Sequence, residues 1–298
     1  MELIKLNNST YGFARNFKHD QKIRASFNRL TESVFDLSLE NWYLDGFWGD
    51  YYIPYSLLHN NKVVSNVSIN RIEFDIEGER KTGIQIGTVM TDEKYRNRGL
   101  NKYLMEKVIL EWKYQTDFVY LFANDSVLDF YPKFNFKVVE EYQYSKTVDT
   151  RRASSSWKNL NMEDPADVAF LMGRIKDSTP QAKISMLNNA SLIMFYCNSS
   201  KRKSIYYVEE LDAIAVADFK GDTLYLDDVC SAGPLEIIEV IQTIPVVKIQ
   251  RVLLGFTPLD ASGFDMHLLK GEGTDTLFML KDKFDFFWSK AIASGVSI

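Results

Sequence analysis

The stretch from Gly83 to Phe136 constrains the fold of this chain more than any other part of the sequence. Side chains from Ile84 to Thr91 alternate between two faces, which predicts a β-strand. Residues 100–112 then repeat apolar side chains at three- and four-residue steps, which predicts an amphipathic helix. The run from Phe118 to Ala123 is almost wholly apolar, as in a strand buried on both faces. Together they predict a right-handed unit with parallel strands, whose ligand lies beyond the strands' carboxyl ends.

The turn that leads into this helix is basic and contains a glycine, Gly99, directly before the helix. Between Lys94 and Lys113 there are six basic and two acidic residues, although the whole chain has a net charge of -5. Free amides at a helix N-terminus, the helix dipole and a small residue together favour a phosphate group. A solvated helix face would explain the lysines but explains the pair Arg98-Gly99 less well. The turn therefore predicts a polyanion site.

Gly87 interrupts the first of these strands. A glycine inside a strand indicates a bulge or the close approach of a ligand to the backbone, and a glycine beside a packed side chain is the plain alternative.

The same residues resemble the acetyl-CoA site of the GCN5-related N-acetyltransferase (GNAT) superfamily. The family pattern, Arg/Gln-x-x-Gly-x-Gly/Ala, is matched by Arg96 and Gly99, while Asn101 stands where a small residue is usual. Asn124 and Tyr131 follow at the expected places. The resemblance covers roughly residues 1 to 145 and implies an α/β fold (an α+β mixed sheet), acetyl-CoA as cosubstrate and no metal. The residues that it implies in cofactor binding are Val89, Met90, Thr91, Arg96, Asn97, Arg98, Gly99, Leu100, Asn101, Lys102 and Asn124.

The resemblance also implies the chemistry, in which a primary amine attacks the thioester directly in a ternary complex. Tyr131 matches the general acid that protonates the leaving thiolate, and a strand amide near Val89 can stabilise the oxyanion. Tyr131 could instead be a core tyrosine, and Asn124 could cap the short helix after it rather than bind pantetheine. The base is left open among water and four carboxylates, which are Glu73, Asp75, Asp92 and Glu93.

The segment from Trp42 to Tyr55 contains seven aromatic and two acidic residues around glycines, which is typical of a loop. In the resembling family this connection helps to form the acceptor pocket, and aromatic faces beside carboxylates suit a protonated amine. Packing of these rings in a core under the loop is the alternative. A helix is expected over residues 20–35, and two strands joined at Asn60-Asn61 are expected to form a hairpin that leads into the parallel unit.

The length of 298 residues predicts two domains, with a catalytic GNAT domain at 1–147 and a second domain at 148–298. The polar segment from Tyr144 to Asn159 is the expected linker. The second half repeats the order strand, glycine turn, helix, strand, but Asp227 and Asp228 stand where a phosphate site favours positive charge. It is therefore expected to be a degenerate GNAT-like domain without CoA, completed by the apolar tail Thr276 to Lys290.

Such a tandem is similar to the front part of the enhanced-intracellular-survival acetyltransferases, and no counterpart of their third domain is expected in these 298 residues. Two cysteines and three histidines show no metal-ligand spacing, and the acidic pI near 5.4 argues against nucleic acid. No apolar run long enough for a signal or a membrane span is present, so we expect a cytoplasmic protein with no membrane partner.

Motifs for dinucleotides, nucleoside triphosphates and serine hydrolases are absent from the sequence. The expected function is an acetyl-CoA-dependent N-acetyltransferase acting on a small-molecule or peptide amine. A non-catalytic CoA-binding sensor or partner-binding module is the alternative. Four points stay open: the acceptor, the general base, a possible homo-oligomer, and whether the second domain shapes the acceptor pocket.

Overall fold

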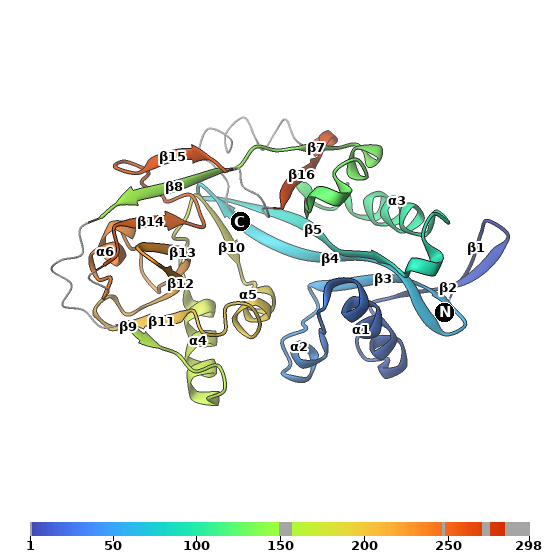
Figure 1. The fold of residues 1–298 in the computed structure, drawn as a ribbon, viewed down its shortest axis with the longest axis horizontal. Helices are drawn as coiled ribbons and strands as arrows, with labels where there is room; N and C mark the ends of the chain where they lie inside the picture. The colour runs from blue at the N-terminus through green and yellow to red at the C-terminus, as the bar shows by residue number, and fades with distance from the viewer. Residues whose placement is uncertain (1, 149–156, 246–247, 270–274, 284–298) are drawn as a thin grey trace. The chain divides into compact units, whose positions relative to one another are not determined.

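The computed structural model describes residues 2–148, 157–245, 248–269 and 275–283. They form two compact units, each built around one mixed sheet (Figure 1). The first unit takes residues 2–72, 82–139 and 275–283, and the second takes residues 73–81, 140–148, 157–245 and 248–269. The units are therefore not the two continuous halves expected from the sequence, because each includes a segment from the other half.

The first sheet contains two hairpins, then the predicted parallel pair, and its strands follow the order β1-β2-β3-β4-β5-β6-β16-β7. Its strands are β1 (Glu2–Leu6), β2 (Ser9–Arg15), β3 (Tyr52–His59), β4 (Lys62–Ile76), β5 (Glu79–Thr91), β6 (Phe118–Ala123), β7 (Phe136–Val138) and β16 (Thr276–Leu280). Its helices are α1 (Gln21–Phe35), α2 (Glu40–Leu44) and α3 (Leu100–Trp112), with the short 3-10 turns η1 (Glu93–Tyr95), η2 (Asp125–Val127) and η3 (Tyr131–Phe134).

Local chemistry sets several of these boundaries. Asp20 caps α1 by accepting hydrogen bonds from the amides of Lys22 and Ile23. Asn60 and Asn61 both have positive φ, which suits the tight turn that joins β3 to β4. The helices α1 and α2 lie on one face of the first sheet and α3 on the other (Figure 1). The predicted helix and hairpin are thus confirmed, and the N-terminal hairpin β1–β2 was not foreseen.

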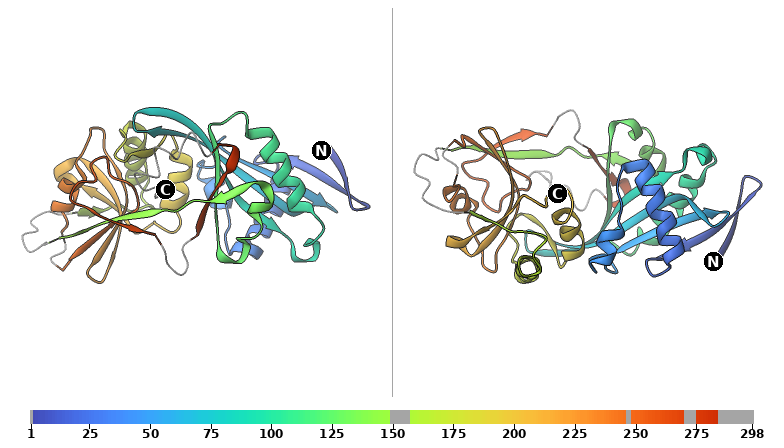
Figure 2. Two further views of the ribbon diagram at one scale, coloured as in Figure 1. Left: turned by 90° about the horizontal axis from the view of Figure 1, so that it is seen from above. Right: turned by 60° about the horizontal axis from the view of Figure 1, so that its bottom comes forward.

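The strand β16 corrects the expectation for the tail. It pairs antiparallel with β6 on one side and with β7 on the other, so it lies inside the first sheet, among strands from the other end of the chain (Figure 2). Phe278 and Leu280 belong to the core of the first unit. The tail was expected to complete the second core, and its residues 284–290 lie outside the described residues. Alternation of apolar residues predicts a strand here but does not say which sheet it joins.

The second sheet has the order β15-β8-β14-β13-β12-β11-β9. Its strands are β8 (Tyr142–Thr147), β9 (Trp157–Asn159), β11 (Ile205–Val208), β12 (Ala213–Lys220), β13 (Thr223–Cys230), β14 (Arg251–Leu254) and β15 (Asp265–Leu268). The strand β10 (Ile184–Leu187) is not part of this sheet and pairs antiparallel with the end of β4. The helices of the second unit are α4 (Pro165–Asp177), α5 (Ala190–Cys197) and α6 (Ile237–Gln242), with the short turn η4 (Glu209–Leu211). The short turn η5 (Lys281–Lys283) follows β16 and belongs to the first unit.

The two sheets follow the same plan. In each sheet a parallel pair is joined through a helix, β5–α3–β6 in one and β13–α6–β14 in the other. In each, the strand beside that pair comes from the other half of the chain, β16 in the first sheet and β8 in the second. The second sheet therefore repeats the strand, helix, strand plan of the first. The expected linker is not a plain linker, because its two ends form β8 and β9.

None of the helices in the described ranges has the length and apolar character that a membrane span requires.

Candidate active site

The parallel strands β5 and β6 pair only along part of their length. The ladder runs from Gly83 opposite Phe118 to Ile86 opposite Leu121, whereas β5 continues to Thr91. Beyond Ile86 the strands separate at their carboxyl ends, which is where ligands bind in open α/β sheets. A side chain built at Gly87 would meet no atom within 4 Å, so the backbone beside this opening is uncovered. The alternative of a glycine beside a packed side chain therefore does not apply, and the close approach of a ligand stays a prediction.

Thr88 is the residue that bends β5 at the opening. Its φ is +49°, a left-handed conformation that is strained for a β-branched residue. The hydroxyl of Tyr52 lies 2.8 Å from Thr88 Oγ1, and Asn66 Nδ2 donates to the Thr88 carbonyl at 2.9 Å. Asn66 is fully buried and is itself held by Ser56, whose hydroxyl donates to Asn66 Oδ1 at 2.7 Å. The opening is therefore built into the sheet by side chains of β3 and β4.

Asn101, the departure from the family pattern, is bonded to the sheet. Ser65 Oγ on β4 donates to Asn101 Oδ1 at 2.7 Å and lies 3.0 Å from Thr91 Oγ1. This bond directs the larger side chain toward the strands and leaves the glycine turn clear. The departure is thus compatible with a ligand in the turn.

The turn before α3 has the backbone that an anion site requires. Asn97 and Gly99 both have positive φ, +62° and +74°. Asn7 Nδ2 donates to the Arg98 carbonyl at 2.8 Å, and Arg98 donates to the Lys94 carbonyl at 2.9 Å. The α3 N-cap is Gly99, which has no side chain to cap the first amides of the helix, so they are left for solvent or a ligand. The Arg98 guanidinium also stacks over the Tyr95 ring, so its first role is to shape the turn.

Arg96 and Lys102 are both exposed at this turn. Lys102 lies 3.8 Å from Glu106, a surface ion pair that contributes little stability. Together with Lys94 and Arg98, which are also exposed, they give the turn its positive charge.

Tyr131 begins η3 and is 5% exposed. Its ring packs against Phe130, Phe136 and, from β16, Phe278. Burial, and then the negative charge of Asp275, raise the pKa of Tyr131 to about 12. No hydrogen bond to its hydroxyl is found in the described part of the chain. The two roles considered for Tyr131, general acid and core residue, are therefore compatible. Its ring is part of the core, and its hydroxyl is not hydrogen-bonded to any described residue.

Asn124 caps the turn η2. Its Oδ1 accepts hydrogen bonds from the amide and the hydroxyl of Ser126, at 3.1 and 2.6 Å. This is the N-cap role that the sequence left open. Its Nδ2 is the group that could donate to a ligand.

The four possible bases lie in different surroundings. Glu73 and Asp75 lie on the part of β4 that pairs with β10 in the second unit. The carboxylate of Asp92 caps η1 by accepting from the Lys94 amide, and Glu93 is exposed in that turn. The geometry assigns the role of base to none of them.

Four of the seven aromatic side chains in the segment from Trp42 to Tyr55 are buried, as the core alternative predicts, and the acceptor pocket stays a prediction. Trp42, Trp48 and Tyr52 are each at most 5% exposed, and Trp42 stacks on Trp48 at 5.6 Å. The segment also includes α2 instead of being loop throughout. Aromatic composition alone could not separate a core from a pocket.

Sequence reasoning missed the polar side chains of β3 and β4 that hold the opening. The available signal was the polar run Ser65-Asn66 followed by Ser68 in an otherwise apolar strand. Buried polar groups are usually hydrogen-bonded, so such a run indicates a partner on a neighbouring strand.

Comparison with known proteins agrees with this architecture. Residues 7–139 match the family model described as an acetyltransferase (GNAT) domain. A conserved protein of unknown function from Enterococcus faecalis V583, described as a probable N-acyltransferase, has a TM-score of 0.58 at 12% identity, over 91% of this chain and 72% of that one. Eis1 from Mycobacterium abscessus has a TM-score of 0.54 at 10% identity, over 89% of this chain and 73% of that one. No curated protein matches the sequence.

Residues 7–139 are thus similar to an acetyltransferase (GNAT) domain, and the fold of the chain resembles that of Eis1.

Proposed function

We propose that the chain is an acetyl-CoA-dependent N-acetyltransferase that transfers the acetyl group to a primary amine by direct attack in a ternary complex. The main observation is the opening between β5 and β6 at the left-handed residue Thr88, near the carboxyl ends of the two strands. The N-terminus of α3, which has no side-chain cap, follows β5 in the chain. The hydroxyl of Tyr131 makes no hydrogen bond within the described ranges. The catalytic residues then lie in the first unit, and the second unit binds no CoA of its own.

Groups of the first unit fit acetyl-CoA. The amides from Asn97 to Lys102 and the side chain of Arg96 would hold the pyrophosphate, because they combine free donors with positive charge. The strand backbone from Val89 to Thr91 and the Asn124 amide would hold the pantetheine. The residues proposed for cofactor binding are Val89, Met90, Thr91, Arg96, Asn97, Arg98, Gly99, Leu100, Asn101, Lys102 and Asn124.

In the transfer, the amine nitrogen bonds to the acetyl carbon and the bond from that carbon to sulfur breaks. The Val89 amide would donate to the carbonyl oxygen as negative charge develops there. Tyr131 gives its proton to the leaving sulfur, while water takes the extra proton from the attacking nitrogen and then returns one to Tyr131. A pKa of about 12 keeps Tyr131 protonated at neutral pH, so its hydroxyl carries the proton that the leaving thiolate needs.

The test is release of free thiol from acetyl-CoA by the whole chain, measured against polyamines, aminoglycosides, peptide N-termini and lysine peptides. Amine-dependent thiol release that saturates, with acetylated amine found by mass spectrometry, supports the proposal and identifies the acceptor class. Tight acetyl-CoA binding with no turnover on any amine would favour the non-catalytic CoA sensor instead. Absence of acetyl-CoA binding would refute both functions.

A further inference from the structure

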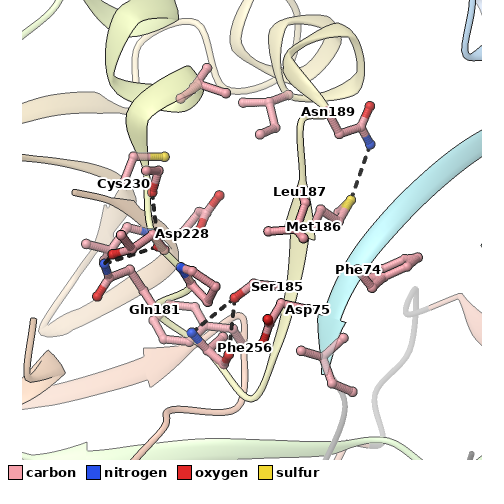
Figure 3. Close-up of a pocket in the computed structure, with 18 of the residues that line it drawn as sticks. Phe74, Asp75, Gln181, Ser185, Met186, Leu187, Asn189, Asp228, Cys230 and Phe256 are labelled. Atoms are coloured by element: carbon pink, nitrogen blue, oxygen red, sulfur yellow. Dashed lines mark hydrogen bonds between the residues drawn. The ribbon is translucent and has the colours of Figure 1, made fainter. Parts of the chain in front are cut away.

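The second unit contains a cavity of about 420 Å³ that the proposed function does not use. Figure 3 shows it between the end of β13, with Asp228 and Cys230, and the strand β10, with Ser185, Met186 and Leu187. All of its lining residues belong to the second unit. Its volume is within the range of small-molecule sites.

This cavity lies at the counterpart of the opening in the first unit. The parallel pair β13–β14 runs from Thr223 opposite Arg251 to Leu226 opposite Leu254. The next residues, Asp227 and Gly255, line the cavity. It therefore occupies the ligand position of an open α/β sheet.

In this unit, side chains already occupy the helix N-terminus and the turn where a phosphate would bind. Glu236 and Glu239 form a capping box that satisfies amides at the start of α6. Gln181 accepts from the Leu235 amide at 3.0 Å and donates to the Gly233 carbonyl at 2.9 Å, so its side chain occupies the turn. The position therefore selects against an anion.

The position between the two parallel strands, where a pantetheine chain would lie, is occupied by the segment 178–183. Thr179 donates through its amide to the Ser231 carbonyl at 2.9 Å, and Lys183 donates to the Thr257 carbonyl at 2.9 Å. The segment 178–183 thus spans from the end of β13 to the residues after β14. What remains is a compact cavity instead of a long slot.

The charges in the wall favour a cation. Lys201 pairs with both Asp218 and Asp227, so Asp227 already has a counter-ion. Asp228 accepts a hydrogen bond from the Val229 amide at 2.8 Å, and no basic side chain pairs with it in the described ranges. Burial and the charge of Asp227 raise the pKa of Asp228 to about 6. At neutral pH it is an ionised carboxylate in a desolvated place, which a bound cation would stabilise.

The rest of the wall is largely apolar. Phe74 and Phe256 come from β4 and the residues after β14, and Met186, Leu187 and Ile193 come from β10 and α5. Arg80 and Lys176 also line the cavity, but both are exposed and can turn toward solvent. A ligand that satisfies both the carboxylate and these side chains needs a cationic end and an apolar body.

We propose that this cavity binds a small primary ammonium compound with an aromatic or branched aliphatic body, with Asp228 as its counter-ion. The site is distinct from the acetyl-CoA site in residues, unit and ligand charge. It is a binding site, with no chemistry assigned to it.

The test is isothermal titration of the whole chain with phenethylammonium chloride and with its neutral isostere, 2-phenylethanol. Asp228→Asn removes the charge at constant shape, and Met186→Trp fills the cavity without changing charge. Asp222→Asn is the matched control, because Asp222 is exposed in the turn at the opposite end of β13.

We expect the ammonium compound to bind at least tenfold more tightly than the alcohol. Asp228→Asn and Met186→Trp should each weaken its binding tenfold or more, and Asp222→Asn should leave it within twofold. Equal binding of the alcohol would mean that the carboxylate does not act as counter-ion. Unchanged binding in Met186→Trp would place the amine elsewhere, for example at the acceptor site of the first unit. Either result, or no binding of the ammonium compound, overturns the proposal. If Asp228→Asn fails to fold, Met186→Trp and the alcohol decide the question.

Discussion

The ring of Tyr131 packs against the ring of Phe278, with 5.7 Å between their centroids. Phe278 lies on β16, which follows the whole second sheet in the sequence, yet this contact is inside the core of the first unit. The proposed general acid is thus positioned by a strand from the other half of the chain.

Truncation of that ring should destabilise the first unit and lower activity together. Phe278 is 1% exposed, so Phe278→Ala should cost about 3–5 kcal/mol of unfolding free energy through lost burial and a cavity beside Tyr131. Val138→Ala is the control, since Val138 pairs with Phe278 across the sheet but is 56% exposed. Chemical denaturation followed by circular dichroism measures both variants. A cost for Phe278→Ala no larger than that of the control would contradict the packing described here.

Substitution of Gly99 should affect both the stability of the turn and the affinity for acetyl-CoA, and a second glycine variant distinguishes the two effects. Gly99→Ala places a side chain at φ +74°, which costs roughly 1–2 kcal/mol of stability, and also obstructs the approach of a phosphate. Gly221→Ala imposes the same kind of strain at φ +65° in the turn between β12 and β13, far from the proposed site in sequence. Calorimetric titration with acetyl-CoA should show weaker binding for Gly99→Ala alone. Equal affinities in the two variants would show that the turn does not contact the ligand.

The raised pKa of Tyr131 predicts the alkaline behaviour of the rate. The acid must be protonated to act, and a pKa of about 12 keeps it so far above neutral pH. The kcat at saturating substrates should therefore show no loss between pH 7 and about 10 from this group. A pH profile with an alkaline limb at or below pH 10 that disappears in Tyr131→Phe would contradict the buried environment.

The raised pKa of Asp228 predicts that the protein becomes less stable as pH rises through the acidic range. Its folded pKa of about 6 lies above its ordinary value of 3.8, so the folded state binds its proton more tightly than the unfolded state does. The unfolding free energy should then fall as pH rises from about 4 to about 6, and stay level above. Asp228→Asn should remove this fall, roughly 1 to 2 kcal/mol once solvent screening is allowed for, while Asp222→Asn should keep it. Denaturation curves at pH 4 and pH 7 that change alike in both variants would refute the assignment.

The sequence predicted those parts of the fold that local patterns determine. The parallel unit followed from alternation in β5, helical spacing in α3 and the apolar run of β6, and the hairpin at Asn60 and Asn61 followed from turn chemistry. The position of the glycine turn at the N-terminus of α3 followed in the same way.

The parts that were missed depend on contacts between distant segments. Nothing near Thr88 in the sequence predicts a left-handed threonine, because Tyr52 and Asn66 on other strands hold it there. The sheet that β16 joins is likewise set by pairing with β6 and β7, which a pattern of alternating residues cannot specify. Burial of Trp42 and Trp48 depends on packing between α2 and β3, so aromatic composition alone could not separate a core from an acceptor pocket.

The most direct test of the account is the rate of thiol release from acetyl-CoA with a saturating amine, compared between the native chain and Tyr131→Phe. Loss of one hydroxyl should lower kcat by about 10² to 10⁴ while acetyl-CoA affinity and the melting temperature stay near native values. Tyr114→Phe, at an 80% exposed tyrosine after α3, should change nothing. Equal rates in native and Tyr131→Phe proteins would contradict the claim that Tyr131 protonates the leaving thiolate.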